Sequence, residues 1–132
     1  MSGRGLPCAL VSTESFDASI LRDCPYSCAV HRRGLTSEIV LEGELDLAAK
    51  PVLDDAVAVA LEPGPVETVI VDLTRVTFAD STTMTWLVQA DARTNAAGGR
   101  LIAVAGPGPV RDVLRMTGLD ERLTLVADGR MR

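Results

Sequence analysis

Basic residues are scarce in this sequence relative to acidic ones. Lysine and arginine together number 13, against 18 aspartate and glutamate residues, which gives a formal net charge of −5. Lys50 is the only lysine. Non-specific binding to nucleic acid needs a basic face that neutralises phosphates, so this composition predicts no nucleic-acid partner. An acidic surface is better suited to solubility and to a basic protein partner.

The sequence also lacks a long hydrophobic run. A membrane-spanning helix needs about 20 mostly apolar residues, and no stretch approaches that length. The apolar stretch from Leu6 to Val11 is too short for the core of a signal peptide, and it is followed by Glu14 and Asp17. We therefore expect a cytoplasmic protein without membrane insertion.

Cysteine is too sparse for a disulfide framework or a closed metal site. Cys8, Cys24 and Cys28 are the three cysteines, so they cannot all pair within one chain. Cys24 and Cys28, together with His31, suggest zinc, but a structural zinc site takes four ligands and the second pair is missing. We expect reduced thiols and no bound metal.

Histidine occurs once, which weakens the catalytic hypotheses. Acyl transfer through Ser81 would need a general base, and His31 lies in a predicted strand of an N-terminal hairpin. Gly106 and Gly108 follow a strand and precede a helix, but the third glycine of a dinucleotide loop and the lysine of a P-loop are absent. The sequence favours a protein that is not an enzyme and uses no cofactor.

The apolar residues that are present suffice for one domain, since 47% of 132 residues are hydrophobic. Alternation from Tyr26 predicts a β-hairpin that turns at Arg33–Gly34. The pattern then predicts a helix over 48–61, a strand at 69–71, a helix over 81–97, a strand over 100–105, a tight connector over 106–109, a short helix over 110–118 and a strand at 123–126. This order indicates an α/β domain with a mixed sheet flanked by helices.

The same pattern predicts buried positions and domain limits. Val76 and Phe78 continue the buried strand, and Ala92 and Met116 fall on the apolar stripes of their helices. We expect residues 1–24 to form a partly disordered N-terminal extension, residues 25–127 to form the domain, and residues 128–132 to form a short tail.

The run Asp80-Ser81-Thr82-Thr83 lies where a buried strand gives way to a helix. Asp80 or Ser81 is predicted to cap the helix by accepting hydrogen bonds from the free backbone amides of its first turn. A phosphoryl group on Ser81 would also be tolerated there, because the amides and the helix dipole favour negative charge. Such a modification would add charge beside Asp80 and could abolish docking without unfolding the domain.

Trp86 lies about one helical turn beyond Ser81, on a face of small residues. An exposed tryptophan there could anchor a protein partner. It could equally pack against a neighbouring loop or helix, because tryptophan usually buries most of its area. Both interpretations remain open from the sequence.

Several motifs follow one another between roughly residues 27 and 126. They are Gly43-Glu44-Leu45-Asp46, Val69-Ile70-Val71-Asp72-Leu73, Val76-x-Phe78-x-Asp80-Ser81, Gly98-Gly99-x-Leu101, Pro109-Val110-x-x-x-Leu114 and Thr117-Gly118-Leu119. In this order they resemble the STAS domain of anti-sigma factor antagonists. The resemblance implies a STAS-type mixed sheet of four to five strands flanked by helices.

The resemblance also implies a function in regulating transcription. Such antagonists bind an anti-sigma factor that is itself a serine kinase, and the kinase phosphorylates the serine at the helix start, here Ser81. A serine phosphatase restores binding. The implied partner contacts are Asp46, Asp80, Thr82, Thr83 and Trp86, with Thr82 and Thr83 as less favoured phosphorylation sites.

Thr83 departs from the family pattern, which has glycine at this position. A β-branched side chain there is expected to crowd the surface that a kinase approaches. This feature favours a second hypothesis, in which the chain is a constitutive, non-phosphorylated STAS scaffold in a signalling or lipid-transport assembly.

Overall fold

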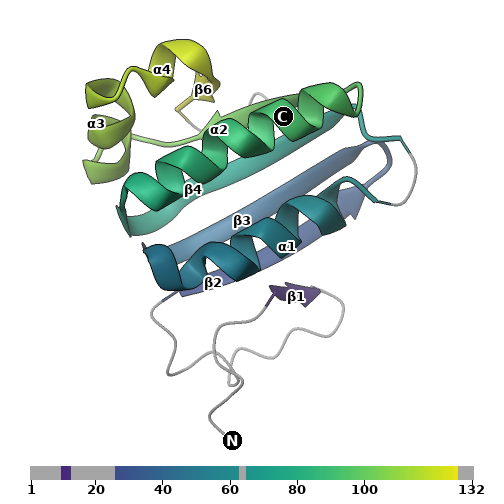
Figure 1. Ribbon diagram of the computed structural model, residues 1–132, viewed down its shortest axis with the longest axis horizontal. Coiled ribbons are helices and arrows are strands. Elements are labelled where there is room, and N and C mark those ends of the chain that lie inside the picture. Colours follow the sequence, from purple (N-terminus) through teal and green to yellow (C-terminus); the bar gives the residue numbers. More distant parts are fainter. Residues whose placement is uncertain (1–9, 13–25, 63–64, 128–132) are drawn as a thin grey trace, which may run out of the picture.

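A computed structural model describes residues 10–12, 26–62 and 65–127 of the chain (Figure 1). The strands are β1 (Leu10–Ser12), β2 (Tyr26–Arg33), β3 (Thr36–Leu45), β4 (Thr68–Ala79), β5 (Arg100–Val104) and β6 (Thr124–Val126). The helices are the 3₁₀ turn η4 (Leu47–Ala49), α1 (Lys50–Ala60), α2 (Ser81–Ala96), α3 (Pro109–Met116) and α4 (Leu119–Arg122).

The strands form one mixed sheet in the order β1-β2-β3-β4-β5-β6. Among the described strands, only the β2–β3 hairpin is antiparallel, and it turns at Gly34, whose φ of 61° suits glycine. The other neighbours pair in parallel. The predicted mixed sheet is confirmed: five strands follow from Tyr26 onward, and β1 adds a sixth at the edge.

Helices α1 and α2 lie side by side over one face of the sheet (Figure 1). Pro51 fits the first turn of α1, where its missing N–H removes no helical hydrogen bond. Leu53 and Val57 of α1 and Leu87 of α2 bury fully against the strands. Together with Leu41 and Val71 of the sheet they belong to one continuous hydrophobic core.

Strand β4 is one of the two central strands of the sheet, and it leads directly into α2. Val69, Ile70 and Val71 are each at most 2% exposed, so successive residues are buried on opposite faces, as predicted for a covered parallel strand. Beyond Asp72, β4 continues beside β3 alone, with two register shifts, and ends at Ala79. This extension places the start of α2 at the end of β3.

Several local predictions need correction. Phe78 is 50% exposed, because the register shifts in β4 change which side chains face the core. Ala92 is exposed on α2, and Met116 is 84% exposed at the end of α3. The turn at Gly118 starts an unpredicted short helix, α4. The extension predicted for residues 1–24 and the tail at 128–132 lie outside the described residues, except for β1.

Among the helices of the described ranges, none combines the length and hydrophobicity needed to cross a membrane.

Candidate functional site

The turn between β4 and α2 is organised by Asp80. Its Oδ1 atom accepts hydrogen bonds from the backbone N–H groups of Thr82 and Thr83, at 3.0 and 3.2 Å. These bonds satisfy two of the amides that a helix start leaves free, so Asp80 is the N-cap. Ser81 follows as the first residue of α2 and is exposed. The hydroxyl of Ser81 is thus held at the surface by a turn that Asp80 stabilises.

The end of β3 is joined to this turn by the carbonyl of Leu45. It accepts hydrogen bonds from the backbone N–H of Asp80 and from Oγ1 of Thr83, each at 3.3 Å. Leu45 is also the register partner of Ala79. Asp46 and Asp80 therefore follow directly after two neighbouring strand ends. Asp46 is exposed and caps η4, accepting from the Ala48 N–H at 3.0 Å.

Thr83 and Trp86 are turned into the domain. Thr83 is 0% exposed and Trp86 is 1% exposed. The Trp86 indole N–H donates to the Leu53 carbonyl of α1 at 2.9 Å, so the tryptophan joins α2 to α1. The expectation that these two side chains contact a partner does not fit their burial. Thr82, in contrast, is half-buried.

The burial of Thr83 also removes the argument that it crowds Ser81. We expect Thr83→Gly to leave the rate of any phosphorylation of Ser81 unchanged, because the threonine side chain does not lie on the surface. The variant should lose about 1–2 kcal/mol of stability, from the hydrogen bond to Leu45 and from the flexibility of glycine. Urea denaturation would measure this, with Thr85→Gly as the exposed control. A kinase rate that rises severalfold would restore the crowding argument.

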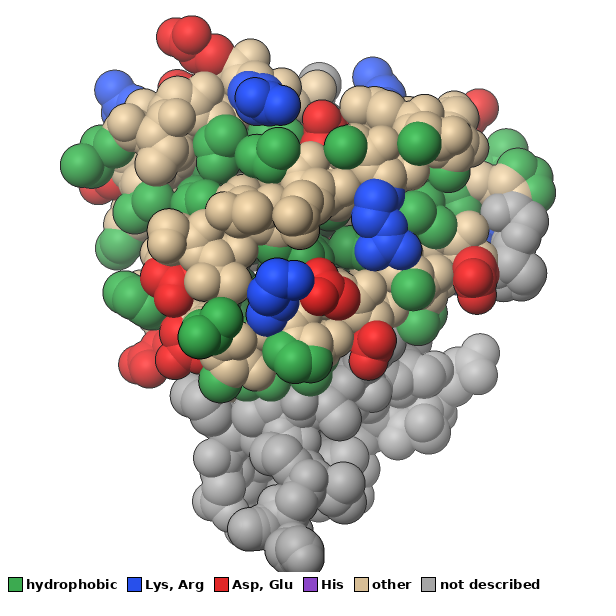
Figure 2. All heavy atoms as spheres, viewed as in Figure 1, with side chains coloured by type: hydrophobic (Ala, Val, Ile, Leu, Met, Phe, Trp, Pro, Cys, Tyr) green, Lys and Arg blue, Asp and Glu red, His purple; other side chains and the backbone are tan. Residues whose placement is uncertain are grey.

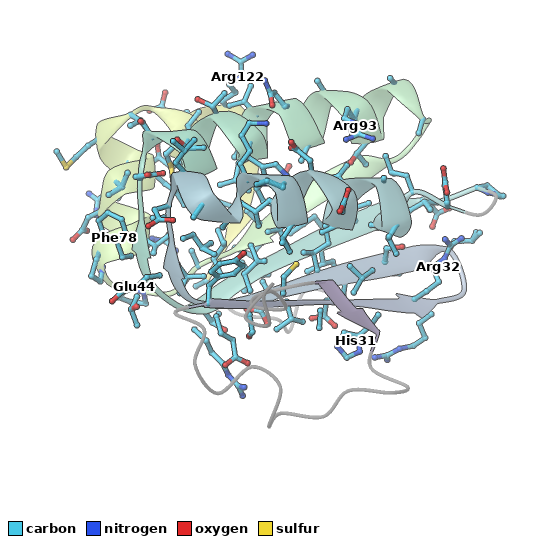
Figure 3. The ribbon with its side chains drawn as sticks, turned by 60° about the horizontal axis from the view of Figure 1, so that its bottom comes forward. His31, Arg32, Glu44, Phe78, Arg93 and Arg122 are labelled. Atoms are coloured by element: carbon cyan, nitrogen blue, oxygen red, sulfur yellow. The ribbon has the colours of Figure 1, made fainter. Side chains whose placement is uncertain are left out.

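Two exposed apolar residues flank the turn and were missed from the sequence. Leu47 is 67% exposed and Phe78 is 50% exposed. Phe78 is the register partner of the exposed Glu44, and Figure 3 shows both at the same end of the sheet. The sequence offered one signal: Leu47 precedes the helix predicted over 48–61, so it is not part of that helix's apolar stripe. We call Glu44, Asp46, Leu47, Phe78, Asp80 and Ser81 the turn face.

The turn face carries uncompensated negative charge. The ion pairs among the described residues join Lys50 to Asp54 at 2.8 Å and Arg75 to Glu42 at 3.3 Å. Neither pair includes a carboxylate of the turn face. Apolar side chains next to carboxylates without an ion pair suit a protein partner with complementary basic residues.

His31 lies at the opposite end of the sheet from Phe78 and Glu44 (Figure 3). It pairs with Glu38, which in turn is the register partner of Ile70. The nine steps along β4 from Ile70 to Ala79 then span about 30 Å at the usual rise of a strand. His31 therefore cannot act as the general base for Ser81.

Cys28 is a buried thiol, 1% exposed, and the loss of solvation raises its pKa from 9.0 to about 12. In a chain with Cys8→Ser and Cys24→Ser, we expect Cys28 to resist iodoacetamide at pH 8 until guanidinium unfolds the protein. The raised pKa of the Cys28 thiol also makes the free energy of unfolding depend on pH. Its stabilising contribution is fully present below pH 9 and is lost between pH 9 and about 12, because in that range the thiol ionises in the unfolded chain but not in the folded one. The variant Thr85→Cys supplies an exposed, reactive control thiol. If Cys28 and this introduced thiol were labelled equally fast in the folded protein, Cys28 would not be buried.

The architecture and turn define an α/β domain with a mixed sheet, in which an exposed serine lies at the Asp80-capped start of α2. A family model described as "Mlab, STAS domain" matches residues 28–127. The chain belongs to the STAS domain family, as its motifs predicted. No curated protein matches the sequence significantly.

Solved structures share the fold of this chain. An anti-sigma factor antagonist from Mycobacterium paratuberculosis is similar with a TM-score of 0.68 at 21% identity, over 78% of this chain and 86% of that one. The anti-sigma factor antagonist SpoIIAA in its unphosphorylated form aligns with a TM-score of 0.64 at 25% identity, over 77% and 90% of the two chains. The Bacillus cell fate determinant SpoIIAA in the phosphorylated form aligns with a TM-score of 0.60 at 26% identity, over 77% and 93%.

Proposed function

We propose that this chain is an anti-sigma factor antagonist that binds an anti-sigma factor with serine kinase activity through the turn face. In this proposal, phosphorylation of Ser81 releases the partner, and a serine phosphatase restores binding. The observation that carries it is the exposed Ser81 at the Asp80-capped start of α2. The likeness to SpoIIAA in unphosphorylated and phosphorylated forms supports the same function. The chain would then be a cytoplasmic regulator of transcription and not an enzyme.

The geometry of the turn explains how a phosphate could act without unfolding the domain. The cap is made by Asp80, so the Ser81 hydroxyl can be modified while both capping hydrogen bonds remain. A phosphoryl group adds about −1.5 to −2 charges near neutral pH. An interface that buries Leu47 and Phe78 would have to desolvate this charge beside Asp46 and Asp80, and desolvating an unpaired charge is costly.

Phosphorylation by anti-sigma factor kinases tests the proposal. The chain is incubated with a panel of such kinases and Mg-ATP, and phosphate is mapped by mass spectrometry. We expect modification of Ser81, none in Ser81→Ala, and unchanged modification in the matched variant Thr82→Ala. Ser81→Asp should weaken binding to the kinase at least tenfold, about 1.4 kcal/mol. Binding that is indifferent to both Ser81 variants would contradict the switch.

A constitutive scaffold is the second candidate function. The description of the matching family model, "Mlab, STAS domain", does not mention an anti-sigma factor antagonist. In that case the chain would co-purify in a stable, stoichiometric complex with a permease, ATPase or sensor subunit. It would also carry no phosphate on Ser81 in cells. Affinity purification of the native chain, followed by mass spectrometry of Ser81, separates the two functions.

A further inference from the structure

An open groove runs from the turn face along α2, between this helix and the α3–α4 pair. Its volume is about 370 Å³, and its apolar walls include Met84, Val88, Val113 and Leu119. Asp80 and Ser81 lie at one end of it. Figure 2 shows hydrophobic side chains gathered between α2 and the helices above it. The groove is therefore continuous with the turn face and carries a carboxylate where the two meet.

The shape of the groove suits a side chain from a partner better than a small free ligand. Val88, Val113 and Leu119 are only half-buried, so the groove is open to solvent along its length. Small-molecule sites usually enclose most of their ligand, which an open groove of this size does not. A volume near the lower end of the range for such sites accommodates one or two apolar side chains held by a larger body.

Charge selects among the possible partners. Asp80 uses Oδ1 for the helix cap, and its carboxylate is the charged group in the groove lining. Glu44 and Asp46 add negative charge on the adjoining turn face, without an ion pair among the described residues. An apolar side chain entering the groove is thus best accompanied by a cation next to it in sequence.

We propose that the groove receives a large apolar side chain of the partner, and that a neighbouring lysine or arginine of the same segment pairs with Asp80. This inference rests on the proposed function, because it names the segment chemistry that the turn face and groove would recognise together. It extends the docking surface from the turn face to Val88 and Leu119. The docking segment is then basic and amphipathic.

Methyl NMR titration tests the groove without any kinase. The probes are three blocked pentapeptides: Gly-Lys-Leu-Lys-Gly, Gly-Glu-Leu-Glu-Gly and Gly-Lys-Ser-Lys-Gly. We expect the first to shift the methyl signals of Met84, Val88, Val113 and Leu119 at millimolar concentration and low salt. The acidic peptide should bind at least fivefold more weakly, and the serine peptide should leave these methyl groups unshifted. Equal shifts from the acidic and basic peptides, or no shifts in the groove, would overturn the proposal.

A matched pair of variants tests whether the peptide binds in the groove. Val88→Lys places a cation in the groove and should abolish the shifts caused by the leucine-lysine peptide. Val59→Lys places the same residue on α1, where Val59 is 47% exposed, and should leave them unchanged. Circular dichroism confirms that both variants fold. A kinase that binds the chain equally well after Val88→Lys would overturn the groove while leaving the proposed function standing. If the leucine-lysine peptide binds the groove but no anti-sigma factor kinase binds the chain, the groove stands and the proposed function is overturned.

Discussion

Replacing Trp86 with alanine should lower the free energy of unfolding by about 3–5 kcal/mol, the usual cost of truncating a buried aromatic side chain. Trp86 is 1% exposed and packs in the core beneath α2. The indole N–H also donates to the Leu53 carbonyl at 2.9 Å, so the substitution removes a link between α1 and α2. The midpoint of thermal unfolding should fall by roughly 10–20 °C for a domain of this size.

Chemical denaturation followed by far-UV circular dichroism measures this loss, since the variant has no tryptophan to report by fluorescence. Trp86→Phe keeps much of the apolar area but not the donor, and should cost about 1–2 kcal/mol. Thr85→Ala changes an exposed neighbour on the same helix and should stay within about 0.5 kcal/mol of the parent. A Trp86→Ala protein as stable as Thr85→Ala would mean that the indole is exposed, and would return Trp86 to the docking surface.

The position of Trp86 could not be predicted because α2 has two buried sides. A single apolar stripe predicts which residues face a sheet, and it correctly included Met84 and Leu87. Because α2 also lies against α1, a second side of the helix is buried, and Trp86 faces it. The presence of a neighbouring helix is a property of the tertiary fold, so a helical period in the sequence cannot reveal it.

The turn itself was predicted well because its chemistry is local. An aspartate before Ser81, Thr82 and Thr83 is a capping signal that involves residues two and three positions apart, and the structure forms those bonds. The apolar members of the turn face were not predicted. The exposure of Phe78 depends on the register shifts between β3 and β4, which arise from pairing residues more than 30 positions apart.

Replacing Gly99 with alanine should destabilise the domain by about 2–3 kcal/mol, at the upper end of the usual cost of overpacking. A Cβ atom at this position would lie 2.7 Å from the Val66 carbonyl oxygen and 3.1 Å from that of Glu67. Both are backbone atoms, so no side chain can rotate away. Arg100 also donates its backbone N–H to the Glu67 carbonyl at 3.1 Å, which holds the two segments together at the start of β5.

The adjacent Gly98 separates this clash from the loss of backbone freedom. Gly98 has φ of 91° and nothing within 4 Å of its would-be Cβ, so Gly98→Ala should cost only about 1 kcal/mol of backbone strain. Asparagine tolerates left-handed backbone, and Gly98→Asn should therefore be close to the parent. Gly99→Asn should be at least as damaging as Gly99→Ala, because any Cβ meets the same carbonyl oxygens. Thermal unfolding of the four variants measures the order of their stabilities. Equal losses of stability at positions 98 and 99 would show that both glycines are needed only for backbone conformation.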